Sequence, residues 1–236
     1  MPPQRPDAVY SLSIMKILAV NGSPRRDWNT ERILDHAVRG ALRAVPAASE
    51  SVQLYPMHYS GCVGCYACKR KDQPSGLCRL NDTLTPILEK AQASDVLLLA
   101  TPVYFFGESA GVRAFIERLL YPWTTFTVDG YGSRCPRPLC VGLLYTLSGT
   151  EQRVMEQGRQ SFSDSTVFFF SLHSTWQERM CVYETLHTDD YSRLELDFFD
   201  PAARKKIRTE RFPEDCERAY ALGASLALKE HEFRRF

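Results

Sequence analysis

The chain has 236 residues, of which 44% are hydrophobic and 11% aromatic, which is enough for the core of one α/β domain. Its 29 basic and 28 acidic residues give a formal net charge of +1, so no charge excess indicates nucleic acid or an anionic membrane as a partner. Apolar runs such as VLLLA at 96–100 fall far short of the ~20 residues that a membrane helix needs, and we expect a soluble protein.

The sequence predicts one main domain behind a short extension. Residues 1–14 carry prolines and charges but no apolar stretch of the kind found in signal peptides, which indicates an N-terminal extension and a cytoplasmic location. Met15 is an alternative start of the chain. No repeat or linker interrupts residues 15–236, so we expect them to form a single domain with a cysteine-rich loop at 58–80.

Apolar runs and helical periodicities alternate along the chain. Residues 14–21 end at Gly22 and predict a buried strand, and Asn29 or Thr30 is placed to cap the helix that follows. The apolar face of that helix comprises Ile33, Leu34, Ala37, Val38, Ala41 and Leu42. Further strands are expected at 51–57, 96–100, 139–146 and 180–187, and further helices at 83–91, from Val112 to Leu120 and from Ala219 to Leu226.

This alternation predicts a flavodoxin-like, doubly wound, five-stranded parallel sheet with helices on both faces. One charged stretch, Thr188 to Phe212, shows no clear element and is too long for an ordinary loop. We expect it to be irregular and to pack over the site or a partner subunit.

The turn after the first strand, NGSPRRDWNT at 21–30, has the residue types of a phosphate site. Backbone N–H groups and the helix dipole attract an anion there, and Ser23, Arg25, Asn29 and Thr30 can add hydrogen bonds. Neither G-x-G-x-x-G nor a Walker lysine is present, so a single phosphate, as on FMN, fits better than a dinucleotide or a nucleoside triphosphate. An ordinary capped turn is the alternative reading of this loop alone.

Two further loops follow predicted strands and so lie at the same edge of the sheet, where ligands of such folds bind. TPVYFFGESAG at 101–111 offers flat aromatic faces at a position where burying three adjacent rings is difficult. YTLSGT at 145–150 offers hydroxyl and backbone donors for the polar rim of a flavin. The predicted contacts are Pro102, Val103, Tyr104, Phe105, Phe106 and Gly107 in one loop, and Thr146, Ser148 and Gly149 in the other.

Four of the eight cysteines stand in one polar stretch. Cys62, Cys65 and Cys68 are each separated by two residues and Cys78 follows after nine, a spacing typical of thiolates that converge on one cluster. The run fits a [4Fe-4S] centre better than a zinc ribbon, which usually joins two separated pairs. The other cysteines are expected to be small apolar residues without chemistry: Cys135, Cys140, Cys181 and Cys216.

Several stretches together resemble the NAD(P)H-dependent FMN reductase superfamily and specifically its iron-sulfur flavoproteins. They are NGSPR with NT, TPVYFFGESAGVRAFIERLLYP, the cysteine run and RTERFPEDCERAYALG. The resemblance spans Met15 to about Leu226, although the spacer before Cys78 is longer than the compact pattern of those proteins. It implies an FMN phosphate at Ser23, Arg25, Asn29 and Thr30, an isoalloxazine ring at Pro102, Tyr104, Phe105 and Gly107, and added contacts from Thr146 and Ser148.

The functional hypothesis is an FMN-dependent oxidoreductase that passes electrons between a reduced donor, FMN and a [4Fe-4S] cluster, with no catalytic acid or nucleophile. An NAD(P)H-dependent FMN or quinone reductase without a cluster stays open. So does a non-enzymatic electron carrier or a metal-stabilised binding module. The resemblance implies a homodimer or homotetramer, with ferredoxin, NAD(P)H or quinone as the redox partner.

Overall fold

The computed structural model describes residues 14–72, 76–156 and 163–234, so the predicted N-terminal extension lies almost wholly outside the described residues. Five parallel strands form the central sheet in the order β2-β1-β3-β7-β8. The two-residue β4 (Gly107–Glu108) adds to the sheet by antiparallel pairing with the end of β3. The predicted flavodoxin-like fold is confirmed, and the five strands are β1 (Met15–Asn21), β2 (Ala47–Gln53), β3 (Val96–Tyr104), β7 (Leu139–Thr146) and β8 (Ser174–Val182).

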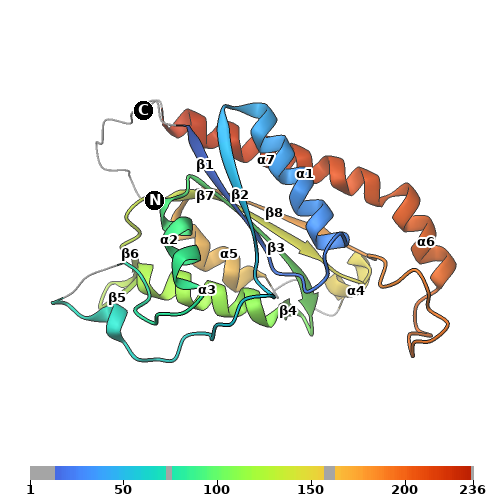
Figure 1. The fold of residues 1–236 in the computed structure, drawn as a ribbon, viewed down its shortest axis with the longest axis horizontal. Helices are drawn as coiled ribbons and strands as arrows, with labels where there is room; N and C mark the ends of the chain where they lie inside the picture. The colour runs from blue at the N-terminus through green and yellow to red at the C-terminus, as the bar shows by residue number, and fades with distance from the viewer. Residues whose placement is uncertain (1–13, 73–75, 157–162, 235–236) are drawn as a thin grey trace.

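Helices cover both faces of the sheet (Figure 1). On one face lie α1 (Asn29–Ala44) and α7 (Phe212–Phe233), and on the other α2 (Thr85–Ala93), α3 (Ala110–Trp123) and α5 (Asp164–Ser171). The remaining elements are η1 (Ala67–Lys69), α4 (Glu151–Glu156), α6 (Pro201–Glu210) and the hairpin of β5 (Thr124–Thr127) with β6 (Gly130–Ser133). Within the described ranges, no helix combines the length and apolar character needed to cross a membrane.

Each face of the sheet has its own hydrophobic core. Successive side chains of a strand point to opposite faces, so Ile17 and Ala19 pack beneath α1 and α7 while Leu18 and Val20 pack beneath α2 and α3. The α1–α7 contact depends on two glycines. A Cβ on Gly40 would lie 1.9 Å from the Tyr220 carbonyl oxygen, and one on Gly223 equally close to that of Ala37, so only glycine permits this crossing.

The structure corrects five details of the predicted elements. The strand expected at 180–187 is β8, which begins at Ser174 and ends at Val182, and the strand expected at 51–57 ends at Gln53. The stretch from Thr188 to Phe212 contains helix α6, whose start is capped by the Asp200 carboxylate through the N–H groups of residues 202 and 203. Leu42 is 39% exposed, outside the buried face of α1.

The fifth correction concerns the start of α1. Its N-cap is Trp28, which makes no side-chain capping bond, and the side chains of Asn29 and Thr30 bind elsewhere. The segment YPWTTF at 121–126, where α3 ends and β5 begins, is divided between the core and the surface. Trp123 is fully buried, whereas Phe126 is 55% exposed.

A buried histidine joins the β5–β6 hairpin to the core. His173 Nε2 lies 3.0 Å from the Thr124 hydroxyl and Nδ1 lies 2.7 Å from that of Ser133, and these two residues are paired across the hairpin. Its ring packs edge-on against Trp123 at 5.8 Å. Burial, and to a lesser extent the Lys69 charge, lowers the pKa of His173 to about 4. The imidazole is therefore neutral at physiological pH.

This burial predicts an acid-sensitive stability. The unfolded chain binds a proton at His173 near pH 6.5 and the folded chain only near pH 4, so stability is present above pH 6.5 and lost as the pH falls toward 4. We expect His173→Gln, which keeps hydrogen-bonding groups, to reduce the loss of unfolding free energy between pH 7 and 4.5 by about 2 kcal/mol. Urea unfolding at both pH values measures it. Identical pH dependence in the two proteins would contradict the assignment.

Candidate functional site

The first loop begins where β1 meets β3 and α3. The Gly22 N–H donates to the Ala100 carbonyl at 2.8 Å, and the Gly22 carbonyl accepts from the Ser109 hydroxyl at 2.7 Å. A Cβ on Gly22 would lie 1.9 Å from Cγ2 of Val112 on α3. Glycine is therefore required here for packing against the helix, and the loop is held in one place.

Several features of the first loop suit an anion. Ser23 is buried, and its N–H donates to the Asn21 Oδ1 at 2.9 Å while its hydroxyl accepts from the Arg25 N–H at 3.1 Å. Because no side chain caps α1, its first N–H groups point into this loop without the usual side-chain acceptor. The Nδ2 of Asn21 is buried and lacks a hydrogen-bond partner within the described residues. Such a cradle of unpaired donors fits a phosphate group.

The chain after β8 is hydrogen-bonded to the same loop. Leu186 offers its carbonyl to the Trp28 Nε1 at 3.0 Å and the Asn29 Nδ2 at 2.8 Å, and the His187 carbonyl accepts from the Arg25 guanidinium. Arg208 of α6 donates to the Asn29 Oδ1 at 2.9 Å. Arg208, from the stretch predicted to pack over the site, thus contacts the first loop, and the Asn29 side chain is already engaged by protein groups.

The second loop is a strained aromatic hairpin between β3 and β4. Tyr104 pairs with Gly107, and the two residues between them, Phe105 and Phe106, have φ values of 49° and 61°. Positive φ at both central positions is the geometry of a type I′ turn, which normally takes Asn and Gly. Phe105 is fully exposed, and Tyr104 and Phe106 are each more than 40% exposed. Strain of this kind is typical of ligand sites.

The third loop meets the first through a hydroxyl pair. Thr146 at the end of β7 lies 2.7 Å from Thr30 of α1, measured between the two Oγ1 atoms, and both residues are buried. Ser148 and Gly149 follow at the same edge and are half-buried. The structure therefore brings the three predicted loops together at the carboxyl ends of β1, β3 and β7, as the topology required.

A buried carboxylate holds the strained turn in place. The Glu108 side chain on β4 is 4% exposed and accepts from the Thr166 hydroxyl at 2.6 Å and the Tyr145 hydroxyl at 3.3 Å. Arg113 adds an ion pair at 3.6 Å. Burial and the Glu108 carboxylate raise the pKa of Tyr145, so its hydroxyl stays protonated as a donor. Sequence reasoning missed Glu108, whose only local signal is its place directly after FFG.

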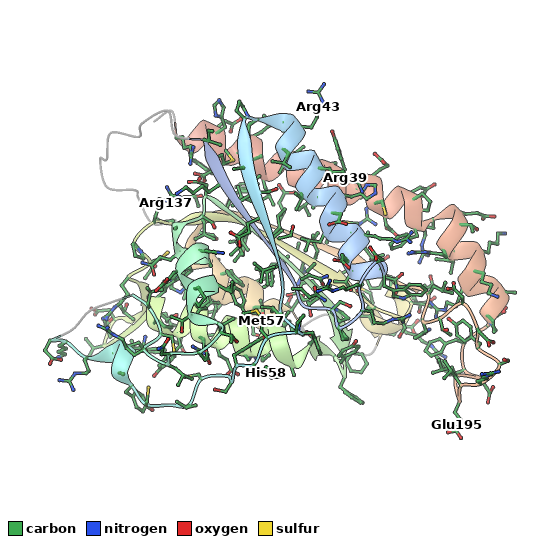
Figure 2. The ribbon with its side chains drawn as sticks, viewed as in Figure 1. Arg39, Arg43, Met57, His58, Arg137 and Glu195 are labelled. Atoms are coloured by element: carbon green, nitrogen blue, oxygen red, sulfur yellow. The ribbon has the colours of Figure 1, made fainter. Side chains whose placement is uncertain are left out.

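The predicted cysteine ligands gather in one place. After β2, the chain runs along the lower margin of the molecule from Met57 and His58 toward the β5–β6 hairpin (Figure 2). Cys62, Cys65, Cys68 and Cys78 all line one hollow, which Arg118 and Tyr121 of α3 complete. Within the described residues, however, no three Cys, His, Asp or Glu side chains are close enough to hold a metal ion. The donor set fits a cluster, and the spacing of its thiols does not.

Cations flank this hollow. The Lys69 ammonium donates to the carbonyls of Tyr121 and Thr124 and lies 4.3 Å from the centre of the Tyr121 ring. Arg118 is fully buried and pairs with the Asp82 carboxylate. Burial raises the pKa of the Cys68 thiol, the neighbouring thiols of Cys78 and Cys62 raise it further, and Lys69 opposes them. Negative charge from several thiolates at this place would therefore meet fixed positive charge.

The other cysteines have structural surroundings. Cys140 and Cys216 are buried in the core beneath α1 and α7, as expected. Cys135 and Cys181 are only partly exposed, and burial raises the pKa of Cys135 to about 12. Burial therefore keeps the Cys135 thiol protonated, and all four thiols lie in packed surroundings.

An open, doubly wound parallel sheet with helices on both faces defines the flavodoxin-like class of fold. Residues 15–168, more than half of the chain, match the NADPH-dependent FMN reductase family. The chain belongs to this family.

Several curated relatives carry the name iron-sulfur flavoprotein. The one from Methanocaldococcus jannaschii is 34% identical over 107 residues, which are 44% of this chain and 51% of the relative. One from Archaeoglobus fulgidus is 29% identical over 143 residues, 60% of this chain and 63% of the relative. The chain thus spans between half and two thirds of the length of these two relatives. They confirm the predicted relationship to the iron-sulfur branch of the superfamily.

Solved structures agree in fold. NAD(P)H:quinone oxidoreductase from Methanothermobacter marburgensis superposes with a TM-score of 0.67 at 15% identity, covering 91% of this chain and all of that one. An FMN-dependent NADH-azoreductase from Bacillus anthracis, in complex with FMN, gives 0.58 at 13% identity, covering 92% of this chain and 99% of that one. At these identities the likeness shows the shared fold alone.

The aromatic turn makes a prediction about stability. Phe105 is fully exposed, so Phe105→Asn removes no packing and places a residue that tolerates positive φ. We expect the free energy of unfolding to rise by about 1 kcal/mol, measured by thermal or urea unfolding. The control Phe105→Leu keeps an unfavourable residue at the same φ and should leave stability unchanged. A decrease with Asn would show that the turn is not strained.

Proposed function

We propose that the protein is an FMN-dependent oxidoreductase whose flavin lies at the carboxyl edge of the sheet, over the three loops. The observation that carries the proposal is the junction of these loops, in which an uncapped helix start and a buried Ser23 adjoin a strained, exposed aromatic turn. A ligand that carries both a phosphate and a flat ring system matches this arrangement, with the phosphate at the helix start and the ring at the aromatic turn. Membership of the FMN reductase family supports it.

The proposed roles follow from the surroundings of each residue. Ser23, Arg25 and the first N–H groups of α1 hold the phosphate, and Thr30 acts through its bond to Thr146. Pro102 to Gly107 contact the ring, with Glu108 keeping their backbone in place. Thr146, Ser148 and Gly149 supply donors at its polar rim. FMN, when bound, supplies two-electron and one-electron transfer chemistry.

The finer proposal is that Cys62, Cys65, Cys68 and Cys78 bind a [4Fe-4S] cluster. It is supported by the common hollow that the four thiols line, by the cations beside it and by the names of the curated relatives. The thiols would have to approach one another on loading, which is usual for metal sites that are completed by the metal. The nine-residue spacer before Cys78 gives the loop the length for such a movement.

A cluster-free NAD(P)H-dependent FMN or quinone reductase is the second candidate. The observation that favours it is that the described thiols are not spaced as metal ligands. For either candidate, the proposal also includes NAD(P)H as co-substrate, a ferredoxin or quinone as redox partner, and assembly as a homodimer or homotetramer.

The phosphate role of Arg25 can be tested by charge reversal. Arg25→Glu places a carboxylate at the predicted phosphate, and we expect FMN affinity to fall at least tenfold because like charges repel. Riboflavin, which lacks the phosphate, should bind wild type and variant within a factor of two of each other. Quenching of flavin fluorescence on titration into flavin-free protein measures both affinities.

The matched control is Arg26→Glu, which makes the same charge change at the next exposed residue. It should leave FMN affinity within about twofold. An equal effect of both variants would contradict a specific contact, and wild-type protein that binds neither flavin would refute the proposed function.

The cluster can be tested by iron and sulfide analysis of anaerobically purified protein. We expect about four iron and four sulfide per chain, and a loss of most of both in Cys62→Ala. Cys216→Ala, on the buried face of α7, is the matched control and should keep the iron. FMN content is measured in the same samples.

Each other outcome selects an alternative. Wild-type protein without stoichiometric iron that oxidises NAD(P)H steadily is the cluster-free reductase. Turnover only with added ferredoxin or a reductase indicates an electron carrier, and zinc without FMN indicates a metal-stabilised binding module.

A further inference from the structure

A hollow of about 200 Å³ lies between α3, α5 and the β5–β6 hairpin, on the face of the sheet opposite α1 and α7 (Figure 1). None of the predicted flavin contacts is among the described residues that line it. It is therefore a second recess, distinct from the three loops at the carboxyl edge.

The lining of this hollow is mainly apolar and aromatic. Ile116 and Leu120 of α3 are both buried side chains of its wall, and the rings that line it are those of Tyr121, Phe126 and Phe169. Tyr131 of β6 packs edge-on against Phe126 at 5.6 Å and against Phe169 at 5.7 Å. One ring thus braces two of the lining rings from outside, which holds the hollow open between the hairpin and α5.

Several polar side chains in the lining are engaged by the protein itself. The Thr124 hydroxyl donates to the Leu120 carbonyl at 2.9 Å, and the Thr166 hydroxyl donates to Glu108 at 2.6 Å. Arg113 lies between the carboxylates of Glu108 and Glu117, at 3.6 Å and 3.9 Å. A bound molecule need not supply partners for these groups, so an uncharged apolar molecule leaves none of them unsatisfied.

The hollow lies between the two proposed redox sites. Thr166 and Arg113 in its lining contact Glu108, the carboxylate that anchors the aromatic turn. Cys62, Glu117 and Tyr121 line both this hollow and the one that contains the four cysteines. A molecule bound here would therefore touch Cys62 of the cysteine site and the two residues, Thr166 and Arg113, that contact Glu108 beside the aromatic turn.

We propose that this hollow binds an uncharged, planar aromatic compound of one or two fused rings. A cavity of about 150 Å³ lined by apolar side chains can hold benzene, so one of about 200 Å³ suits a slightly larger ring system. Aromatic lining favours a flat ligand, which can stack or pack edge-on. The binding does not require FMN or a cluster to be present.

The test uses 2-naphthol as the probe, titrated into the full chain with and without FMN and followed by calorimetry. We expect one site with a dissociation constant of about 0.1 mM. Ser165→Trp places a bulky ring into the hollow from an exposed position of α5 and should weaken binding at least tenfold. Ser171→Trp makes the same change at an exposed position of that helix outside the lining and should leave affinity within twofold.

Equal affinity of the three proteins, or no binding by wild type, overturns the proposal. Sedimentation of the same samples tests whether a second copy of the chain occupies the hollow instead. If Ser165→Trp converts an oligomer to monomers and wild type does not bind the probe, the hollow is a subunit contact. FMN affinity is measured in parallel, so protein that binds FMN but not naphthol refutes only this inference, and protein that binds naphthol but not FMN refutes only the proposed function.

Discussion

The close approach of Gly22 to α3 is the constraint on which the arrangement of the site depends. Its backbone N–H and carbonyl are hydrogen-bonded to Ala100 of β3 and to Ser109 at the start of α3, and a side chain at this position would collide with Val112. The first loop and α3 therefore keep a fixed relation. Since α3 also carries Glu117 and Tyr121, which line both hollows, one contact relates the phosphate loop to the cysteine region.

The fold could be predicted where burial leaves a continuous apolar run, as in β3 and β7, because strands covered on both faces exclude polar residues. Prediction failed where burial is partial. Between the buried Ser174 and Met180, the residues of β8, at the edge of the sheet, are partly or fully exposed and mostly polar, so the apolar pattern begins only at Met180. Helix α6 has no apolar stripe and packs through guanidinium groups, with Arg204 over the Phe199 ring and Arg208 over the Phe212 ring.

The same distinction separates the predicted from the missed parts of the site. Loop residues and cysteines stand in short local patterns, and adjacent parallel strands bring their ends together, so the sequence could predict their gathering. Glu108 and Arg208 act through partners 37 to 179 residues away, for which no local spacing exists. Likewise, the bond between Thr30 and Thr146 follows from the strand order and from no motif.

The carbonyl groups of Leu186 and His187 that fasten onto the first loop connect two distant parts of the chain. Beyond them the chain runs out to an exposed turn, with Glu195 at its outer end (Figure 2), before α6 returns to the loop through Arg208. A ligand that immobilises Arg25 lowers the entropic cost of ordering residues 188–200. By linkage, ordering of these residues raises the affinity for the ligand by the same factor. The resistance of residues 188–200 to protease cleavage therefore reports on occupancy of a loop formed more than 150 positions earlier in the sequence.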